Sequence, residues 1–246
     1  MTRTDVTKPT AAIVTGGSQG IGAAIIERLA ARGLQTINLD RQPPAASSPA
    51  RYVQADLLVA ESRDEALACI MREYDILWLA NNAATVAPAS LDDANYADFV
   101  RVTTLNLWAA IACTQAVLPA MRRRRFGRIV NIASRAALGK ELRTVYSATK
   151  AGLIGMTRTW ALELGNDGIT VNAIGPGPIE TELFHASNPR ESPRTHAIIN
   201  GIPVRRLGQV GDIAHAAGFF LEDETSFVTG QVLYVCGGLS VGATQV

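Results

Sequence analysis

The chain has 246 residues, of which 48% are hydrophobic, and this is enough to bury one large core in a single domain. Its 23 basic and 22 acidic residues give a formal net charge of +1, which argues against nucleic-acid and membrane partners and leaves small molecules or other subunits. Three widely separated cysteines, Cys69, Cys113 and Cys236, argue against disulfides and against zinc, and no metal site is predicted.

The N-terminal segment, residues 1–10, is polar and lacks the apolar core of a signal peptide. We expect it to be a flexible end that precedes a single domain over residues 11–246. No later stretch has eighteen uninterrupted apolar residues, so no membrane helix is expected. The sequence therefore predicts a cytoplasmic protein.

Short apolar runs alternate with helical patterns along most of the chain. The repeated order of strand and then helix indicates a parallel sheet with right-handed crossovers. This is an α/β Rossmann fold, a doubly wound sheet of about seven strands with helices on both faces. Strands are predicted at residues 11–14, 34–39, 52–54, 76–80, 128–133, 169–173 and 231–235, and helices at residues 23–31, 61–73, 99–123, 146–164 and 212–221.

Residues 181–202 differ from the rest of the chain. They include several Pro and Asn residues, show no clear periodicity and are too many for an ordinary connection. Long irregular segments in compact domains often act as lids over a site, and disorder is the alternative. We favour a substrate lid.

A glycine turn, Gly16 to Gly22, lies between the first predicted strand and helix. Such a turn lets a pyrophosphate approach the backbone at a helix N-terminus, where free N–H groups favour anions. The spacing is not Gly-x-Gly-x-x-Gly, and a turn without a ligand is the alternative. Asp40, at the end of the second strand, favours NAD, because a carboxylate there accepts both ribose hydroxyls and repels a 2′-phosphate. Arg41 weakens this preference, since it can pair with that phosphate.

Tyr146 and Lys150 stand four positions apart in a predicted helix and therefore lie on one face of it. A nearby cation lowers the pKa of a tyrosine and makes the phenol a usable acid and base. Because such pairs are common on helix surfaces, the catalytic interpretation depends on the residues around this one.

Taken together, these features resemble the short-chain dehydrogenase/reductase family over residues 11–238. The resemblance extends to its 3-oxoacyl-carrier-protein reductases and its secondary-alcohol dehydrogenases. It depends on an ordered set of motifs and not on any single one. These motifs are Thr15-Gly16-x-x-x-Gly20-x-Gly22, Asn81-Asn82-Ala83-Ala84, Asn106, Ser134, Tyr146-x-x-x-Lys150 and Pro176-Gly177.

The resemblance implies a catalytic group of four residues. Tyr146 would be the acid and base, and Ser134 would hydrogen-bond the substrate carbonyl or alcohol. Lys150 would lower the tyrosine pKa and hold the nicotinamide ribose, and Asn106 would position a water that links Lys150 to solvent. These roles agree with the chemistry, because hydride transfer to a carbonyl builds alkoxide charge that needs aimed donors and a proton.

The resemblance also implies a cofactor site for NAD, with NADP less favoured. Gln19 supports NAD, because it is neutral where phosphate-preferring members often carry a basic residue. Ala84 stands where the family usually has glycine and Cys236 where an aspartate is common, and neither change removes a reacting group. The residues expected at the cofactor are Gly16, Ser18, Gln19, Gly20, Ile21, Gly22, Asp40, Arg41, Asp56, Leu57, Asn82, Ala83, Ala84, Tyr146, Lys150, Pro176, Gly177, Ile179 and Thr181.

The predicted function is the NAD-dependent interconversion of a secondary alcohol and a ketone. The substrate would lie between the catalytic group, the loop 136–143 and the lid. An apolar or cyclic substrate with one polar end suits this loop, and so does a 3-oxoacyl thioester. The residues expected to line the substrate site are Ser134, Ala136, Leu138, Glu141, Tyr146, Leu183 and Phe184.

Two other functions stay open at this point. One is reduction of a 3-oxoacyl thioester of acyl carrier protein or coenzyme A, although the family's thioester reductases usually prefer NADPH. The other is a non-catalytic dinucleotide sensor or scaffold, which predicts damage to the catalytic group, whereas that group is intact. We interpret Arg122 to Arg125 as a solvated helix end and not as a carrier dock. The resemblance further implies a homotetramer in which the helices at 99–123 and 146–164 pair across one interface.

Overall fold

The computed structural model describes residues 8–241, so most of the predicted flexible N-terminus lies outside the described residues. A seven-stranded sheet has the order β3-β2-β1-β4-β5-β6-β7, and all six neighbouring pairs are parallel. The predicted doubly wound Rossmann fold is confirmed. The strands are β1 (Thr10–Thr15), β2 (Thr36–Asp40), β3 (Arg51–Gln54), β4 (Asp75–Asn81), β5 (Gly127–Ile132), β6 (Ile169–Pro176) and β7 (Val232–Val235).

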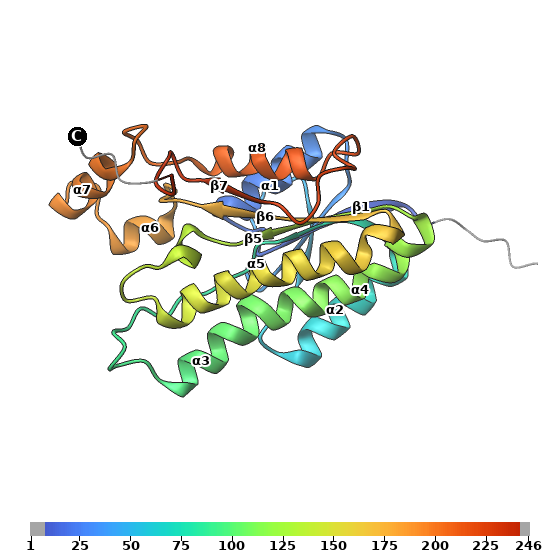
Figure 1. Ribbon diagram of the computed structural model, residues 1–246. Coiled ribbons are helices and arrows are strands. Elements are labelled where there is room, and N and C mark those ends of the chain that lie inside the picture. Colours follow the sequence, from blue (N-terminus) through green and yellow to red (C-terminus); the bar gives the residue numbers. More distant parts are fainter. Residues whose placement is uncertain (1–7, 242–246) are drawn as a thin grey trace, which may run out of the picture.

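Helices cover both faces of the sheet (Figure 1). One layer contains α2, α4 and α5, and the other contains α1 and α8, which pack against each other. The central strands β4, β5 and β6 are buried along their whole length, which explains their nearly continuous apolar sequences. The helices are α1 (Gly20–Ala31), α2 (Ala60–Glu73), α3 (Tyr96–Thr103), α4 (Ala109–Arg124), α5 (Thr144–Leu164), α6 (Glu182–Ser187), α7 (Pro193–Gly201) and α8 (Val210–Phe220).

Strand order reverses between β1 and β4. The chain runs outward from β1 to β2 and β3 and then crosses back to start the other half at β4. In open α/β sheets, ligands bind in the crevice outside the carboxyl ends of the strands at such a point. The glycine turn after β1 and Asn82 after β4 lie at this crevice.

The secondary structure of the predicted lid differs from the prediction. Residues 181–202 are not irregular but contain α6 and α7. The Thr181 side chain accepts the Phe184 N–H at the start of α6, and the Ser192 side chain accepts the Thr195 N–H at the start of α7, each over 3.1 Å. Pro193 occupies the first turn of α7, where its missing N–H costs nothing. Helices this short carry too little periodicity to be read from sequence.

The helix predicted at residues 99–123 is also interrupted. It divides into α3, a π-helical turn η1 (Thr104–Trp108) and α4. The whole stretch Tyr96–Arg124 is long and apolar enough to span a membrane by length and composition alone. Its side chains Val102, Cys113 and Met121 are fully buried within the domain, and α4 packs on β4. We therefore interpret the stretch as a core helix of the α/β layer.

The basic run Arg122 to Arg125 lies at the C-terminal end of α4, as the sequence predicted. Its side chains are paired and not merely solvated. Arg122 bonds to Asp167 over 2.9 Å, and Arg123 and Arg124 share the carboxylate of Asp75 over 2.9 and 3.0 Å. The run therefore ties the end of α4 to the start of β4 and to the turn after α5.

Candidate active site

Ser134 and Tyr146 lie at the carboxyl edge of the sheet. Ser134 follows β5 and begins a short 3-10 helix, η2 (Arg135–Leu138), where its hydroxyl accepts the Ala136 N–H over 3.1 Å. Tyr146 lies in the first turn of α5 and is half-buried. The hydrogen bonding of Ser134 acts on the Tyr146 hydroxyl, so the two side chains are near neighbours.

Lys150 lies one turn after Tyr146 and is 2% exposed. Its Nζ donates to the Ile132 carbonyl over 2.7 Å and lies 5.6 Å from the centroid of the Tyr146 ring. Burial lowers the pKa of Lys150 to about 8. The carbonyl at the end of β5 thus holds a cation near the Tyr146 ring.

The structure does not show the predicted lowering of the Tyr146 pKa by Lys150. Burial raises the pKa of Tyr146, and the hydrogen bonding of Ser134 and the charge of Arg143 oppose that rise in part. The physical reason is that desolvation of a phenol disfavours its anion.

Asn106 lies in the π-helical turn and is 2% exposed. Its Nδ2 donates to the Thr85 carbonyl and to Thr149 Oγ1, each over 3.0 Å, and its Oδ1 accepts the Thr85 N–H over 2.8 Å. Thr149 in turn donates to the Tyr146 carbonyl over 2.8 Å. Asn106 therefore links the segment after β4 to the first turn of α5. Its predicted role in positioning a water stays a proposal.

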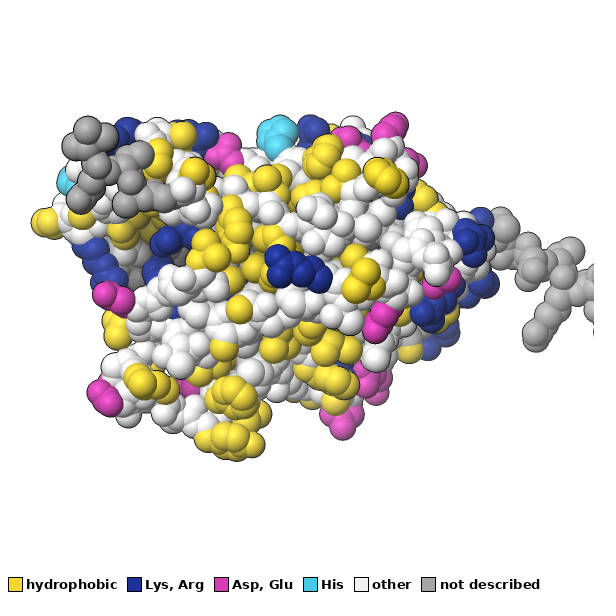
Figure 2. Space-filling model, viewed as in Figure 1, with side chains coloured by type: hydrophobic (Ala, Val, Ile, Leu, Met, Phe, Trp, Pro, Cys, Tyr) yellow, Lys and Arg dark blue, Asp and Glu magenta, His cyan; other side chains and the backbone are white. Residues whose placement is uncertain are grey.

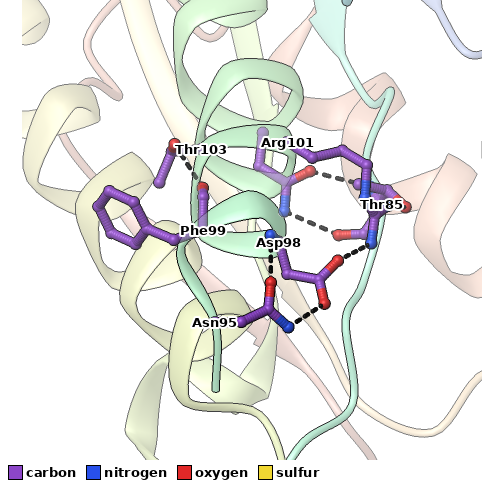
Figure 3. A network of polar contacts seen from close by, with 7 residues as sticks. Thr85, Asn95, Asp98, Phe99, Arg101 and Thr103 are labelled. Atoms are coloured by element: carbon purple, nitrogen blue, oxygen red, sulfur yellow. Dashed lines mark hydrogen bonds and ion pairs between the residues drawn. The ribbon is translucent and has the colours of Figure 1, made fainter. Parts of the chain in front are cut away.

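The segment after β4 is also tied to the start of α3 (Figure 3). Arg101 donates to the Thr85 hydroxyl over 3.2 Å and pairs with Asp98 over 2.6 Å. Asn95 caps the helix by accepting the Asp98 N–H over 2.9 Å. Thr85 is thus held by α3 on one side and by Asn106 on the other.

The glycine turn forms a cradle next to the N-terminus of α1. Gly16 and Gly20 have φ values of +65° and +57°, which L side chains rarely adopt. A Cβ on Gly22 would lie 2.2 Å from the Gly16 carbonyl oxygen, whereas a Cβ on Gly20 would meet only the Thr181 methyl at 3.7 Å. Among residues 8–241, no side chain caps α1. Open space and uncapped N–H groups therefore fit a phosphate here.

Asp40 lies beside this turn at the end of β2. Its Oδ2 accepts the Ser18 N–H over 3.0 Å and its Oδ1 accepts the Gln42 N–H over 3.1 Å. Each carboxylate oxygen keeps acceptor capacity for a further donor, such as a ribose hydroxyl. Arg41 is exposed and forms no ion pair within residues 8–241.

Asn38 was not anticipated as a site residue. It is fully buried in β2, accepts the Gly17 N–H over 3.0 Å and donates to the Ser18 hydroxyl over 2.9 Å. It therefore holds the middle of the glycine turn. The sequence feature that could have identified Asn38 is an asparagine inside an otherwise largely apolar strand, because a buried amide needs hydrogen-bond partners.

The structure brings the remaining predicted cofactor residues to the same edge. Asn82 donates through Nδ2 to the Thr15 and Gly16 carbonyls over 3.0 and 2.9 Å, and so joins β4 to the glycine turn. Asp56 is half-buried and Leu57 buried after β3. The other members lie at the ends of β1, β4 and β6: Gln19 and Ala84 are exposed, Ile21, Ala83, Gly177 and Thr181 are half-buried, and Pro176 and Ile179 are buried.

The predicted substrate residues are divided between two segments. Ala136 is buried beside Ser134, and Leu138 and Glu141 are exposed on the loop that leads to α5. Phe184 is half-buried on α6, and the side chain of Leu183 lies outside the described part of the chain. The structure therefore brings Ser134, Tyr146 and Lys150 together, whereas the residues predicted to line the substrate site are partly exposed.

Comparisons with known proteins agree with this arrangement. A family model described as enoyl-(acyl carrier protein) reductase matches residues 16–240. The BbsD subunit of (2S)-[(R)-hydroxy(phenyl)methyl]succinyl-CoA dehydrogenase from Thauera aromatica is 36% identical, covering 94% of this chain and 97% of its own. The 3-oxoacyl-[acyl-carrier-protein] reductase FabG of Escherichia coli is 35% identical, covering 93% and 96%.

Two solved structures extend the likeness to three dimensions. YwfH, an NADPH-dependent reductase involved in bacilysin biosynthesis, has a TM-score of 0.89 at 27% identity, covering 96% of this chain and 100% of its own. A 3-oxoacyl (acyl-carrier-protein) reductase from Agrobacterium tumefaciens C58 with NADP bound has a TM-score of 0.85 at 27% identity, covering 94% of each chain.

The fold and the edge of the sheet define an oxidoreductase that acts on CH–OH or carbonyl groups with a nucleotide cofactor. The chain belongs to the short-chain dehydrogenase/reductase family, as its motifs indicated.

Proposed function

We propose that the protein is an NAD-dependent oxidoreductase that interconverts a secondary alcohol and a ketone. The observation that carries this proposal is the position of Tyr146 between the Ser134 hydroxyl and the buried Lys150 ammonium, at the same sheet edge as the glycine turn. A non-catalytic sensor has no need of this arrangement.

In alcohol oxidation, the Tyr146 phenolate accepts the hydroxyl proton of the substrate while the carbinol carbon loses a hydride. The Ser134 hydroxyl donates a hydrogen bond to the developing carbonyl oxygen. In this proposal the Lys150 charge, 5.6 Å from the ring centroid, offsets part of the cost of burying the phenolate. When bound, the nicotinamide supplies the hydride acceptor. Ketone reduction follows the same steps in reverse, with Tyr146 as the proton donor.

A second candidate is the reduction of 3-oxoacyl thioesters. It is supported by the curated relatives, since BbsD acts on a coenzyme A thioester and FabG is a carrier-protein thioester reductase by name. The experiment that separates the two candidates follows NADH absorbance with cyclic and aryl secondary alcohols on one side and 3-oxoacyl thioesters on the other. Turnover of neither class by the folded protein would contradict both.

We propose that NAD is preferred over NADP, on the basis of the Asp40 carboxylate at the end of β2 and the neutral Gln19. The two related structures described above are named for NADPH and NADP, and they favour NADP instead. Arg41 also favours NADP, because a guanidinium can pair with its 2′-phosphate. The preference therefore depends on the negative charge of Asp40 outweighing Arg41 at the ribose.

Replacing Asp40 with Asn should raise kcat/KM with NADP relative to NAD by about tenfold, the equivalent of about 1.4 kcal/mol. Asn removes the charge that repels a 2′-phosphate but keeps an oxygen for the Ser18 N–H. The matched variant Arg41→Gln should shift the ratio the other way. Equal efficiency of the unmodified enzyme with both cofactors would remove the proposed role of Asp40.

We also propose a homotetramer. Large apolar side chains are exposed in and next to the two segments that the resemblance assigns to an interface: Tyr96 at 79% on α3, Trp108 at 49% on η1 and Leu162 at 85% on α5. Figure 2 shows hydrophobic side chains gathered at the lower edge of the molecule, over α3. Light scattering should give about four times the chain mass of 26.1 kDa. A monomer would contradict the proposal.

A further inference from the structure

Four basic residues gather at the mouth of the proposed substrate site. Arg135, Lys140 and Arg143 lie on the segment between Ser134 and Tyr146, and Arg194 lies on α7. Partial desolvation lowers the pKa of Lys140, and the charges of Arg143, Arg135 and Arg194 lower it further, although much of the lysine surface is exposed. We call these four residues the mouth cluster.

The mouth cluster combines four neighbouring cations with no carboxylate within ion-pair distance in the described residues. None of its members forms an ion pair with a carboxylate in the described residues. Several arginines elsewhere on the surface are paired, whereas others within residues 8–241, such as Arg41 and Arg72, are not. The pairs elsewhere are Arg51–Glu73, Arg101–Asp98, Arg122–Asp167, Arg123–Asp75, Arg124–Asp75, Arg190–Glu180 and Arg206–Asp212.

Carboxylates are present on the same segments but do not neutralise the cluster. Glu141 is exposed on the loop, and Glu182 and Glu191 are exposed on the lid. None of the three forms an ion pair within the described part of the chain. Gathered cations without a partner repel one another, so the bare cluster destabilises the folded state. Clusters that cost stability in this way are typical of ligand sites.

The mouth cluster is continuous with the catalytic group. Arg135 directly follows Ser134, and Arg143 precedes Tyr146 by one helical turn and acts on its hydroxyl through its charge. Arg194 lies on α7 of the lid, close enough to Lys140 for its charge to act on that lysine. Figure 2 shows a hollow at this end of the molecule, beneath the lid helices, with Lys and Arg side chains on its walls.

We propose that the mouth cluster binds an anionic group, a carboxylate or a phosphate, at the end of the substrate distant from the reacting carbon. This inference rests on the proposed function, because it names the substrate class of that same site. Guanidinium groups bind both anions through paired N–H donors, and a lysine adds a point charge. With residues on both walls, an anion would draw the lid and the loop together.

The test uses the variant pair Lys140→Gln and Arg194→Gln, singly and combined. Both residues are exposed, so folding is preserved, and neither adjoins Ser134 or Tyr146. The matched control is Arg72→Gln, an exposed arginine on α2 without an ion pair in the described residues. Arg135 and Arg143 are left intact because they adjoin the catalytic group.

The first readout is binding, measured by calorimetric titration of the protein saturated with NADH. Acetoacetate tests a carboxylate source and free coenzyme A tests a phosphate source. The double variant should bind at least one of them about tenfold more weakly, and added salt should weaken binding to the unmodified protein. Binding that is unchanged by the double variant, or equally weakened by Arg72→Gln, would overturn the proposal. This readout does not need turnover, so it stands if the proposed reaction fails.

The second readout is kinetic and compares charged substrates with neutral analogues. The pairs are acetoacetate with methyl acetoacetate, and acetoacetyl-coenzyme A with the acetoacetyl thioester of N-acetylcysteamine. The double variant should raise KM about tenfold for the charged member of one pair and leave that of its neutral partner within about twofold. An equal rise for both members would show loss of general packing and would contradict anion recognition.

Discussion

Replacing Tyr146 with Phe is expected to lower kcat by about 10³-fold. General acid–base catalysis by a positioned side chain contributes about 10² to 10⁴-fold, and the Tyr146 hydroxyl is the group that exchanges the substrate proton in the proposed mechanism. The ring stays, so its packing is kept. Steady-state kinetics with the substrate found by the NADH screen measures the effect.

The control for this variant is Tyr234→Phe on β7, whose hydroxyl has no hydrogen bond within the described residues. It should keep kcat within about twofold. NADH binding, followed by fluorescence, should be similar in both variants. Turnover by Tyr146→Phe at the unmodified rate would mean that another group moves the proton.

Replacing Lys150 with Met is expected to stabilise the folded protein at pH 7 while lowering kcat by about 10²-fold or more. Burial lowers the pKa of Lys150 from 10.5 to about 8. The charged form at pH 7 therefore costs folding free energy, at about 1.4 kcal/mol for each pKa unit of that difference. Met removes that cost but also removes the donor to the Ile132 carbonyl. The net gain should be about 1 to 3 kcal/mol, measured by urea unfolding.

The pH dependence checks the cause of this gain. Because the folded-state pKa of Lys150 lies below the unfolded value, the unfolded chain holds more protons between pH 8 and 10.5. Stability of the unmodified protein should therefore rise across that window, and Lys150→Met should lack this contribution. A matched variant is Lys8→Met, whose ammonium also donates to a backbone carbonyl, that of Met71. A Lys150→Met protein that is less stable, with an unchanged pH slope, would contradict the argument.

The sequence was sufficient for the fold because the signals for it are local. Apolar strands, glycine turns and helix stops occur within a few residues of each other, and parallel order follows from their alternation. The position of Ser134 and Tyr146 at one edge follows as well, because parallel strands end at the same side of the sheet.

What the sequence could not supply depends on distant partners. The partners of Asn106, Thr85 and Thr149, come from other elements, and the π-helical turn that presents Asn106 has no local signature. The mouth cluster was missed for the same reason, since Arg194 is far along the chain from Lys140. The Tyr146 pKa was misjudged because burial could not be known before the fold.

The hydrogen bonds of the Asn82 side chain limit where this protein can accept substitutions. By bonding to two carbonyls of the glycine turn, this side chain fastens the crevice between β1 and β4, so the cofactor half has little room for substitution. The lid helices add few side chains to the core, and the loop before α5 is largely exposed. Mutations can therefore accumulate in those two segments at small cost to stability, and new substrate preferences can evolve there while the hydride-transfer machinery is inherited unchanged.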